Sequence, residues 1–204
     1  TDIISKTTNE IFVPITVGGG LRSLLDVENV LRAGADKVSI NTAAIKDPNI
    51  IDSIAKRFGS SCVALSIEAK KKDEENWEAY YDNGREHSGL SVIDWAKEGQ
   101  ERGAGEILIT SVDRDGTKQG FDIDLAHNVS DKIKVPLIIS GGLGKLEHIT
   151  DYLEKNIIHA VKDKMVFLED LLSINNNNLV INSGRDIIYL DSLIFIIYKN
   201  IIDK

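Results

Sequence analysis

Two glycine-rich turns are the residues of this sequence best suited to bind a phosphate group. Gly18-Gly19-Gly20 follows an apolar run and precedes a helical pattern, and Gly141-Gly142 has the same place after a second apolar run. Glycine lets the backbone come close to a phosphate, and the following helix N-terminus supplies amide donors and partial positive charge. A tight turn without a ligand is the alternative for each, but two related turns favour phosphate binding.

Polar residues at the ends of other apolar runs are candidates for acid–base chemistry and ligand orientation. Glu68 ends a very apolar run, where partial burial would raise the pKa of its carboxyl group; an ion pair with Lys or Arg is the alternative. Asp115 lies in a polar segment after another run, where a catalytic group is possible but the residues alone favour an Asp-Gly turn with solvated charges. Asn41 and Thr42 end a further run and could orient a ligand or simply cap the turn.

Five apolar runs predict the strands that position these groups. They are rich in β-branched residues and nearly continuous in hydrophobicity, as in a parallel sheet covered on both faces, and they span 13–17, 37–41, 62–68, 106–111 and 135–140. Helical patterns alternate with them at 24–32, 49–57, 92–102, 122–132 and 145–154. Aromatic residues before Asn83-Gly84 predict a β-hairpin with a two-residue turn after the third strand. This alternation predicts an α/β fold with a parallel sheet.

An internal repeat indicates the size of the complete fold. Residues 13–27 align with residues 135–149, which places the second segment 122 positions after the first. Two halves of this length correspond to the about 250 residues of a (β/α)8 TIM barrel. The strand at 62–68 opens the second half, so its first-half partner would begin roughly sixty residues before residue 1. We therefore expect a barrel truncated at the N-terminus, with its first two βα units missing and residues 1–164 forming the partial barrel.

Residues 165–204 are expected to form a divergent C-terminal tail. From residue 173 onward, nine Ile, six Asn and no Ala occur in 32 residues. This bias resembles translation of an AT-rich reading frame, so a shifted frame near residue 160 is one hypothesis. The alternative is a genuine divergent strand and helix that replaces the last barrel helix.

Charge and composition exclude several functions. The formal net charge of −8 argues against general nucleic-acid binding, and the single cysteine, Cys62, excludes an internal disulfide. No apolar stretch reaches the ~18–20 uncharged residues of a membrane span. The four histidines share no metal-ligand spacing. The sequence therefore predicts a cytoplasmic protein with no metal, no cofactor, and neither a nucleic-acid nor a membrane partner.

Several segments resemble the cyclase subunit family of imidazole-glycerol-phosphate synthase, an enzyme of histidine biosynthesis. They are VPITVGGGLRS, RAGADKVSINTAA, CVALSIEAK, GAGEILITSVDRDGTKQGFD and PLIISGGLG, and the resemblance covers about residues 11–148. It implies a lyase that forms a heterodimer with a glutaminase (amidotransferase) subunit. Ammonia from that partner would convert a bis-phosphorylated ribulosyl-formimino-carboxamide ribotide to imidazole glycerol phosphate and aminoimidazole carboxamide ribotide.

The resemblance also implies which residues form the site. One substrate phosphate would be bound by Gly19, Gly20, Asn41 and Thr42. The other would be bound next to Asp115, by Gly116, Gly141 and Gly142. Glu68 stands where the family has one of its two acid–base aspartates, and Glu68 and Asp115 are the candidate catalytic residues.

Departures from the family pattern keep two other functions open. Glu68 replaces an aspartate, the hairpin reads YDNGREHSG rather than the usual pattern, and the strand that carries the other aspartate is absent from these residues. Glu68 and the hairpin are reminiscent of a paralogous subunit that acts with an amidotransferase in lipopolysaccharide or surface-sugar biosynthesis. The other alternative is an inactive fragment, and we expect no turnover from residues 1–204 alone.

Overall fold

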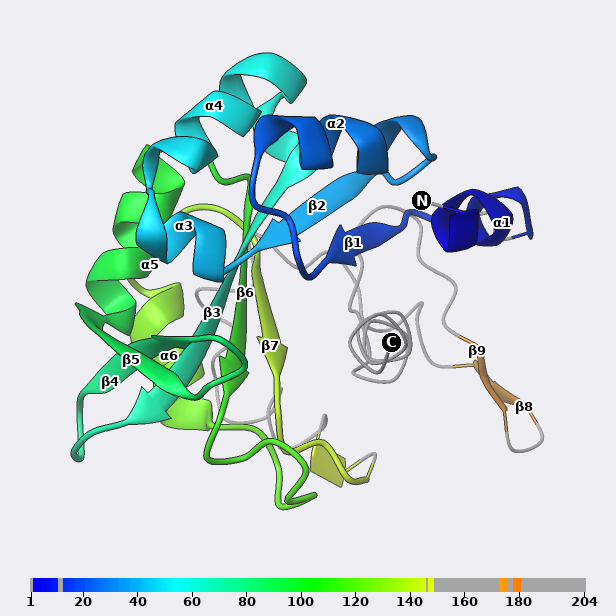
Figure 1. Cartoon of the computed structure of the whole chain (residues 1–204). Helices are drawn as coiled ribbons and strands as arrows, with labels where there is room; N and C mark the ends of the chain where they lie inside the picture. Colours follow the sequence, from blue (N-terminus) through cyan, green and yellow to red (C-terminus); the bar gives the residue numbers. More distant parts are fainter. Residues whose placement is uncertain (1, 11–12, 146, 149–172, 176–177, 181–204) are drawn as a thin grey trace.

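The computed structural model describes residues 2–10, 13–145, 147–148, 173–175 and 178–180. Its centre is a seven-stranded sheet in which five strands are parallel (Figure 1). The parallel strands follow the order β1 (Thr16–Gly18), β2 (Lys37–Ile40), β3 (Val63–Lys71), β6 (Glu106–Ser111) and β7 (Leu137–Ser140). The predicted α/β class with a parallel sheet is confirmed.

Four helices connect these strands and lie around one face of the sheet (Figure 1). They are α2 (Leu24–Arg32), α4 (Asn49–Phe58), α5 (Val92–Glu101) and α6 (Ile123–Ser130), with the short α3 (Thr42–Lys46) before α4 and α1 (Asp2–Glu10) before β1. Because the strand order never reverses and such crossovers are right-handed, they all fall on the same face. This is the winding of a (β/α)8 barrel wall, whereas a doubly wound sheet reverses its order.

The parallel strands alternate between an apolar and a polar face. Residues on the apolar face pack under the helices and are at most 2 % exposed, among them Val38, Ile40, Leu65, Ile67, Ile107 and Ile109. The opposite face carries half-buried polar residues such as Ser39, Ser66, Glu68 and Thr110. We predicted strands covered on both faces; in the part of the chain that is described, helices cover one face, and the other carries these polar residues together with Ala64 and Leu108.

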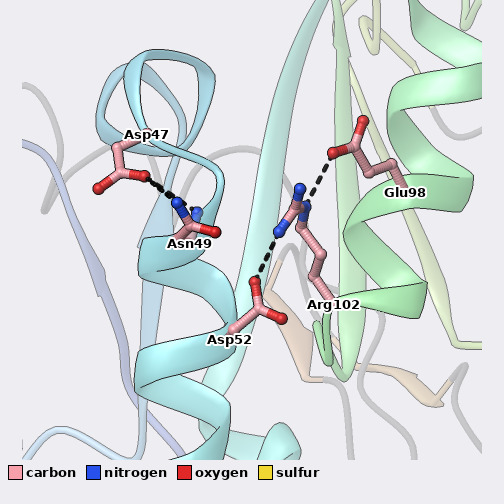
Figure 2. Close-up of polar contacts among 5 residues, drawn as sticks. All are labelled: Asp47, Asn49, Asp52, Glu98 and Arg102. Atoms are coloured by element: carbon pink, nitrogen blue, oxygen red, sulfur yellow. Dashed lines mark hydrogen bonds and ion pairs between the residues drawn. The ribbon is translucent and has the colours of Figure 1, made fainter.

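Local sequence signals set where two helices begin. The Ser23 hydroxyl accepts from the Asp26 amide at 3.2 Å, and the Asp26 carboxylate accepts from the Ser23 amide at 2.9 Å. This capping box confirms the predicted bounds of α2. Before α4, the Asp47 carboxylate accepts from the amide and the side chain of Asn49 at 3.2 and 2.9 Å (Figure 2). Pro48 lies between Asp47 and α4 with helical dihedral angles, which the fixed φ of proline favours.

An ion-pair network joins α4 to α5 on the outer surface (Figure 2). Arg102, directly after α5, donates to Asp52 of α4 at 2.8 Å and to Glu98 of α5 at 2.8 Å. The hydrogen bonds to Asp52 and then to Glu98 raise the pKa of the Arg102 guanidinium. These side chains are accessible to solvent, so the network orients neighbouring helices and contributes little free energy.

A β-hairpin extends the sheet beside the end of β3. β4 (Trp77–Tyr81) pairs with residues 68–71 on the edge where β2 pairs with residues 63–65, while β6 occupies the other edge. β5 (Glu86–Ser91) completes the predicted hairpin. The expected two-residue turn is wrong, because the turn comprises residues 82–85 and three of them have positive φ. Where β2 stops, the hairpin pairs with β3 in its place, and its tip lies beside Thr42, just after β2, and beside Glu68 of β3.

Asp122 ties the base of this hairpin to α6. Its buried carboxylate accepts from the Trp77 indole at 3.2 Å, the Leu125 amide at 3.1 Å and the Ser111 hydroxyl at 3.4 Å. We expect Asp122→Ala to lower the free energy of unfolding by about 2–4 kcal/mol, because it removes the N-cap of α6 and the acceptor of two buried donors. Urea unfolding measures this, with the exposed Asp124→Ala on the same helix as control. Equal effects of the two substitutions would contradict the assigned role.

The described part of residues 165–204 is a short antiparallel pair, β8 (Ser173–Asn175) with β9 (Asn178–Val180). The remainder of the expected tail lies outside the described residues, as does most of the helix predicted at 145–154. The division at residue 164 therefore stays a prediction. No helix among those described is long and apolar enough to cross a membrane.

Candidate active site

A cavity of about 690 Å³ opens at the carboxyl ends of β1 and β2. Its wall includes Gly19 and Gly20 after β1, and Asn41 and Thr42 after β2. The structure thus brings the four residues of the first expected phosphate site around one cavity. The volume is that of a typical small-molecule site and leaves room for the part of a substrate that carries a phosphate group.

The glycine turn after β1 leaves its side of the cavity open. Gly20 has a φ of 72°, and a Cβ built there would meet no atom within 4 Å. Just before α2, the Asp26 carboxylate accepts from the backbone amides of Arg22 and Ser23 at 3.0 and 2.9 Å. These hydrogen bonds, the one from Arg22 foremost, hold the pKa of Asp26 below its ordinary value. An anion in the cavity would therefore find the Arg22 and Ser23 amides occupied, whereas the space beside Gly20 is open.

Asn41 and Thr42 are attached to the hairpin. The Asn41 side-chain amide donates to the Tyr80 carbonyl at 3.2 Å, and the Thr42 hydroxyl accepts from the Asp82 amide at 3.2 Å. Oδ1 of Asn41 is buried and has no hydrogen-bond partner in the described structure. At the cavity wall, the side-chain nitrogen of Asn41 is therefore hydrogen-bonded, whereas its side-chain oxygen has no donor in the described structure.

Glu68 lies on the polar face of β3, opposite Tyr80 of β4 and Thr110 of β6. Its Oε2 accepts from the Gly84 amide at 2.8 Å. Burial raises the pKa of the Glu68 carboxyl above its ordinary value, which the Gly84 and Asn41 donors oppose and the Asp82 charge reinforces. The predicted upward shift is confirmed. The alternative of an ion pair is not found among the described contacts of Glu68.

The residues of the second expected phosphate site meet at the ends of β6 and β7. A Cβ on Gly141 would lie 2.8 Å from the Ser111 carbonyl oxygen and 3.4 Å from the Asp115 nitrogen, so the two turns are in close contact. Gly142 follows with a φ of 98°, and Gly116 has a φ of 71° with no atom within 4 Å of its Cβ position. These residues do not line the cavity at β1 and β2. They form a separate cluster on the same edge of the sheet.

The two candidate catalytic carboxylates differ in their surroundings. Asp115 is exposed in the loop after β6, and its backbone amide donates to the Ser111 carbonyl at 2.9 Å. The contacts described for Asp115 do not connect it to Glu68. Glu68 is half-buried, hydrogen-bonded and shifted in pKa. The structure therefore favours Glu68 as the group prepared for proton transfer.

Sequence reasoning missed three features of the sheet ends. Arg22 and Lys46 add two cationic side chains to the cavity wall, and Lys46 also lies 5.7 Å from the Tyr81 ring centroid. Their positions shortly after the glycine turn and after Asn41-Thr42 are a signal that could have found them. At the opposite, amino ends of the strands, Lys37 of β2 forms an ion pair with Glu106 of β6. The sequence gives no sign of that pair, since the two residues lie far apart in the chain.

Among the described residues, no three His, Cys, Asp or Glu side chains gather in a way that could hold a metal ion. The polar groups at the carboxyl ends of the strands are instead amides, hydroxyls, the cationic Arg22 and Lys46, and carboxylates of which Glu68 is half-buried. A parallel sheet wound in one direction, with such groups at this edge, defines the class of β/α-barrel proteins that act on small ligands. A profile of the family described as "Histidine biosynthesis protein" matches residues 1–171, and the chain belongs to this family.

Similar proteins share one name. The chain is 57% identical over 146 residues to "Imidazole glycerol phosphate synthase subunit HisF" of Legionella pneumophila, which covers 72% of this chain and 69% of that protein. It is 46% identical over 166 residues to proteins of the same name from Bacillus cereus strains Q1 and AH187, covering 81% of this chain and 66% of each. The chain thus spans about two thirds of the length of these curated relatives.

Proposed function

We propose that the protein is the cyclase subunit of imidazole-glycerol-phosphate synthase, a lyase of histidine biosynthesis. The relatives that carry this name support the proposal at 46–57% identity. The observation that carries it is the order of the strands. Glu68 lies on β3, between the glycine turn that follows β1 and the glycine turn that follows β7. A substrate with a phosphate at each end would span this edge and place its reacting centre near Glu68.

The chemistry follows from the protonation state of Glu68. Ammonia adds to the ribulosyl carbonyl carbon, and the carbonyl oxygen takes up a proton as it becomes a hydroxyl. A carboxyl group whose pKa burial has raised can donate that proton, and its conjugate base can accept a proton from nitrogen during ring closure. One group then serves as acid and base in successive steps, while the two glycine turns bind the phosphates and hold the substrate in place.

A glutaminase subunit is the proposed source of ammonia, and a heterodimer in the cytoplasm is the proposed assembly. The names of the relatives support a subunit role, since each is called a subunit of the synthase. Pull-down of a glutaminase by the tagged protein, with glutamine-dependent activity of the pair, would test this part.

The test of the activity uses the full-length gene product with an ammonium salt and the bis-phosphorylated ribotide. We expect imidazole glycerol phosphate and the carboxamide ribotide to appear in equal amounts. Substrate binding without either product would contradict the cyclase activity. Ammonia incorporation into a surface-sugar precursor, and not into this substrate, would assign the protein to the paralogous group.

The first phosphate site predicts a selective effect of Gly20→Ala. The new methyl group would project into the open cavity, so we expect KM for the substrate to rise about tenfold or more through lost amide contacts to phosphate. Stability should fall by only about 1 kcal/mol, the cost of the left-handed backbone for alanine. Gly89→Ala is the matched control, because Gly89 has a φ of 78° and equally open surroundings but lies in β5. An unchanged KM in Gly20→Ala would remove Gly20 from the site.

A further inference from the structure

The tip of the hairpin, residues 82–85, contacts the site residues of two neighbouring strands. The Gly84 amide donates to Oε2 of Glu68 at 2.8 Å, and the Asp82 amide donates to the Thr42 hydroxyl at 3.2 Å. Just before the tip, the Tyr80 carbonyl accepts from the Asn41 side chain at 3.2 Å. On the hairpin side every one of these groups is a backbone group. The contacts therefore depend on the conformation of the tip and not on its side chains.

The backbone conformation of the tip is defined by three successive positive φ values and by packing against a residue after β6. Asp82, Asn83 and Gly84 have φ values of 52°, 58° and 71° in succession, which turns the Gly84 amide toward β3. A Cβ on Gly84 would lie 3.4 Å from Val112, the residue that follows β6, so the tip rests on this side chain. At the other end of the hairpin, Trp77 donates to the buried Asp122. The hairpin is thus fixed at its tip by Val112 and at its open end by Asp122, as an element that positions another group must be.

We propose that the hairpin tip positions the acid–base group, with Gly84 as a positioning residue whose amide orients the Glu68 carboxylate toward the substrate edge of the sheet. The inference rests on the proposed function of Glu68. A glutamate side chain has several rotatable bonds, and the Gly84 amide at 2.8 Å, together with the Asn41 donor, restricts the orientation of its carboxylate. Gly84 does not itself touch the substrate.

The same hydrogen bond couples the hairpin to the charge of Glu68. Burial raises the pKa of Glu68, and the Gly84 amide opposes that rise because it stabilises the ionised form. Asp82 on the tip is the charged group that acts on Glu68, whereas the end of β2 presents the Asn41 amide and β6 presents Thr110. Losing the Gly84 donor while Glu68 stays buried should therefore raise the pKa of Glu68 further and make its protonated form a weaker acid.

The first experiment needs no variant. In the full-length protein labelled with ¹³C at Glu carboxyl groups and ¹⁵N at amides, NMR follows Glu68 and Gly84 against pH, with Glu68→Gln assigning the carboxyl signal. We expect the Gly84 amide proton to move downfield as pH rises, with the same midpoint as the Glu68 carboxyl. A Gly84 amide proton whose chemical shift does not change with the ionisation of Glu68 would overturn the proposal. The measurement is independent of turnover, so it can fail or succeed whatever the activity of the protein.

The second experiment compares Gly84→Ala with Gly89→Ala, which has a similar φ of 78° in the same hairpin but no contact with Glu68. In Gly84→Ala we expect a higher Glu68 pKa, a kcat reduced about tenfold and KM within about twofold of the wild type. The pH–rate profile should shift upward with the pKa. Adding Val112→Ala relieves the contact below the tip and should restore part of kcat. An unchanged Glu68 pKa in a folded Gly84→Ala protein would refute the positioning role.

Discussion

Replacing Glu68 by glutamine is expected to lower kcat about a hundredfold or more and, at the same time, to raise thermal stability at neutral pH. The loss of kcat follows because an amide of the same length can accept from Gly84 but cannot transfer a proton. Since glutamine retains this hydrogen bond, KM should change little. Steady-state kinetics with ammonium and substrate measures both constants. A kcat close to that of the wild type would exclude Glu68 from the proton transfers.

The gain in stability follows from the sign of the pKa shift. Burial raises the pKa of Glu68 in the folded protein above its unfolded value. Between these two pKa values the folded state binds more protons than the unfolded state, so stability falls as pH rises through this window. Glutamine has no charge to desolvate and avoids the loss. The difference in Tm between Glu68→Gln and the wild type should therefore be larger at pH 8 than at pH 4.

A matched control separates this effect from the removal of any acidic charge. Glu86 lies exposed on β5, in the same hairpin region. Glu86→Gln should leave kcat and the pH dependence of Tm unchanged. If both substitutions raised Tm equally, net charge and not burial of Glu68 would be the cause. A stabilised but inactive Glu68→Gln protein would show that the site holds a group whose burial disfavours its charged form, as active sites commonly do.

Replacing Gly142 by alanine is expected to destabilise the protein by about 3–5 kcal/mol, a large fraction of the stability of an ordinary domain. A Cβ at this position would lie 2.1 Å from the Gly120 carbonyl oxygen, and Gly142 has a φ of 98°. Overpacking against backbone and an unfavourable φ add here, and a backbone atom cannot rotate away. The Gly120 amide also donates to the Gly142 carbonyl at 2.7 Å, so the two turns would separate.

Gly116→Ala is the control for this prediction, because Gly116 has a φ of 71° and no atom within 4 Å of its Cβ position. It should lose only about 1 kcal/mol, the conformational part of the cost. Urea unfolding of both variants gives the comparison. If Gly142→Ala unfolds at the same urea concentration as Gly116→Ala, the close contact of the two turns does not limit stability. The expected difference would establish that glycine at position 142 is required by packing as well as by any phosphate.

The sequence predicted best those elements whose causes are local. The bounds of α2 agree with the prediction because Ser23 and Asp26, three residues apart, form the reciprocal hydrogen bonds of a capping box. The glycine turns follow their strands as expected. The hairpin was predicted from its aromatic residues and Asn83-Gly84, but its turn was not, because Glu68 and Val112 stabilise the four-residue form and both lie outside the hairpin.

The sequence by itself determined the order of strands and helices, the glycine turns at two strand ends, and the family to which the chain belongs. These depend on periodicity, turn chemistry and motifs, which are properties of short segments. Only the tertiary structure showed that Glu68 and Asp115 differ in their surroundings, and the choice of Glu68 as the proposed proton-transfer group rests on that difference. That choice depends on desolvation and on the Gly84 donor, and both arise because β2 ends early and the hairpin pairs with β3 in its place.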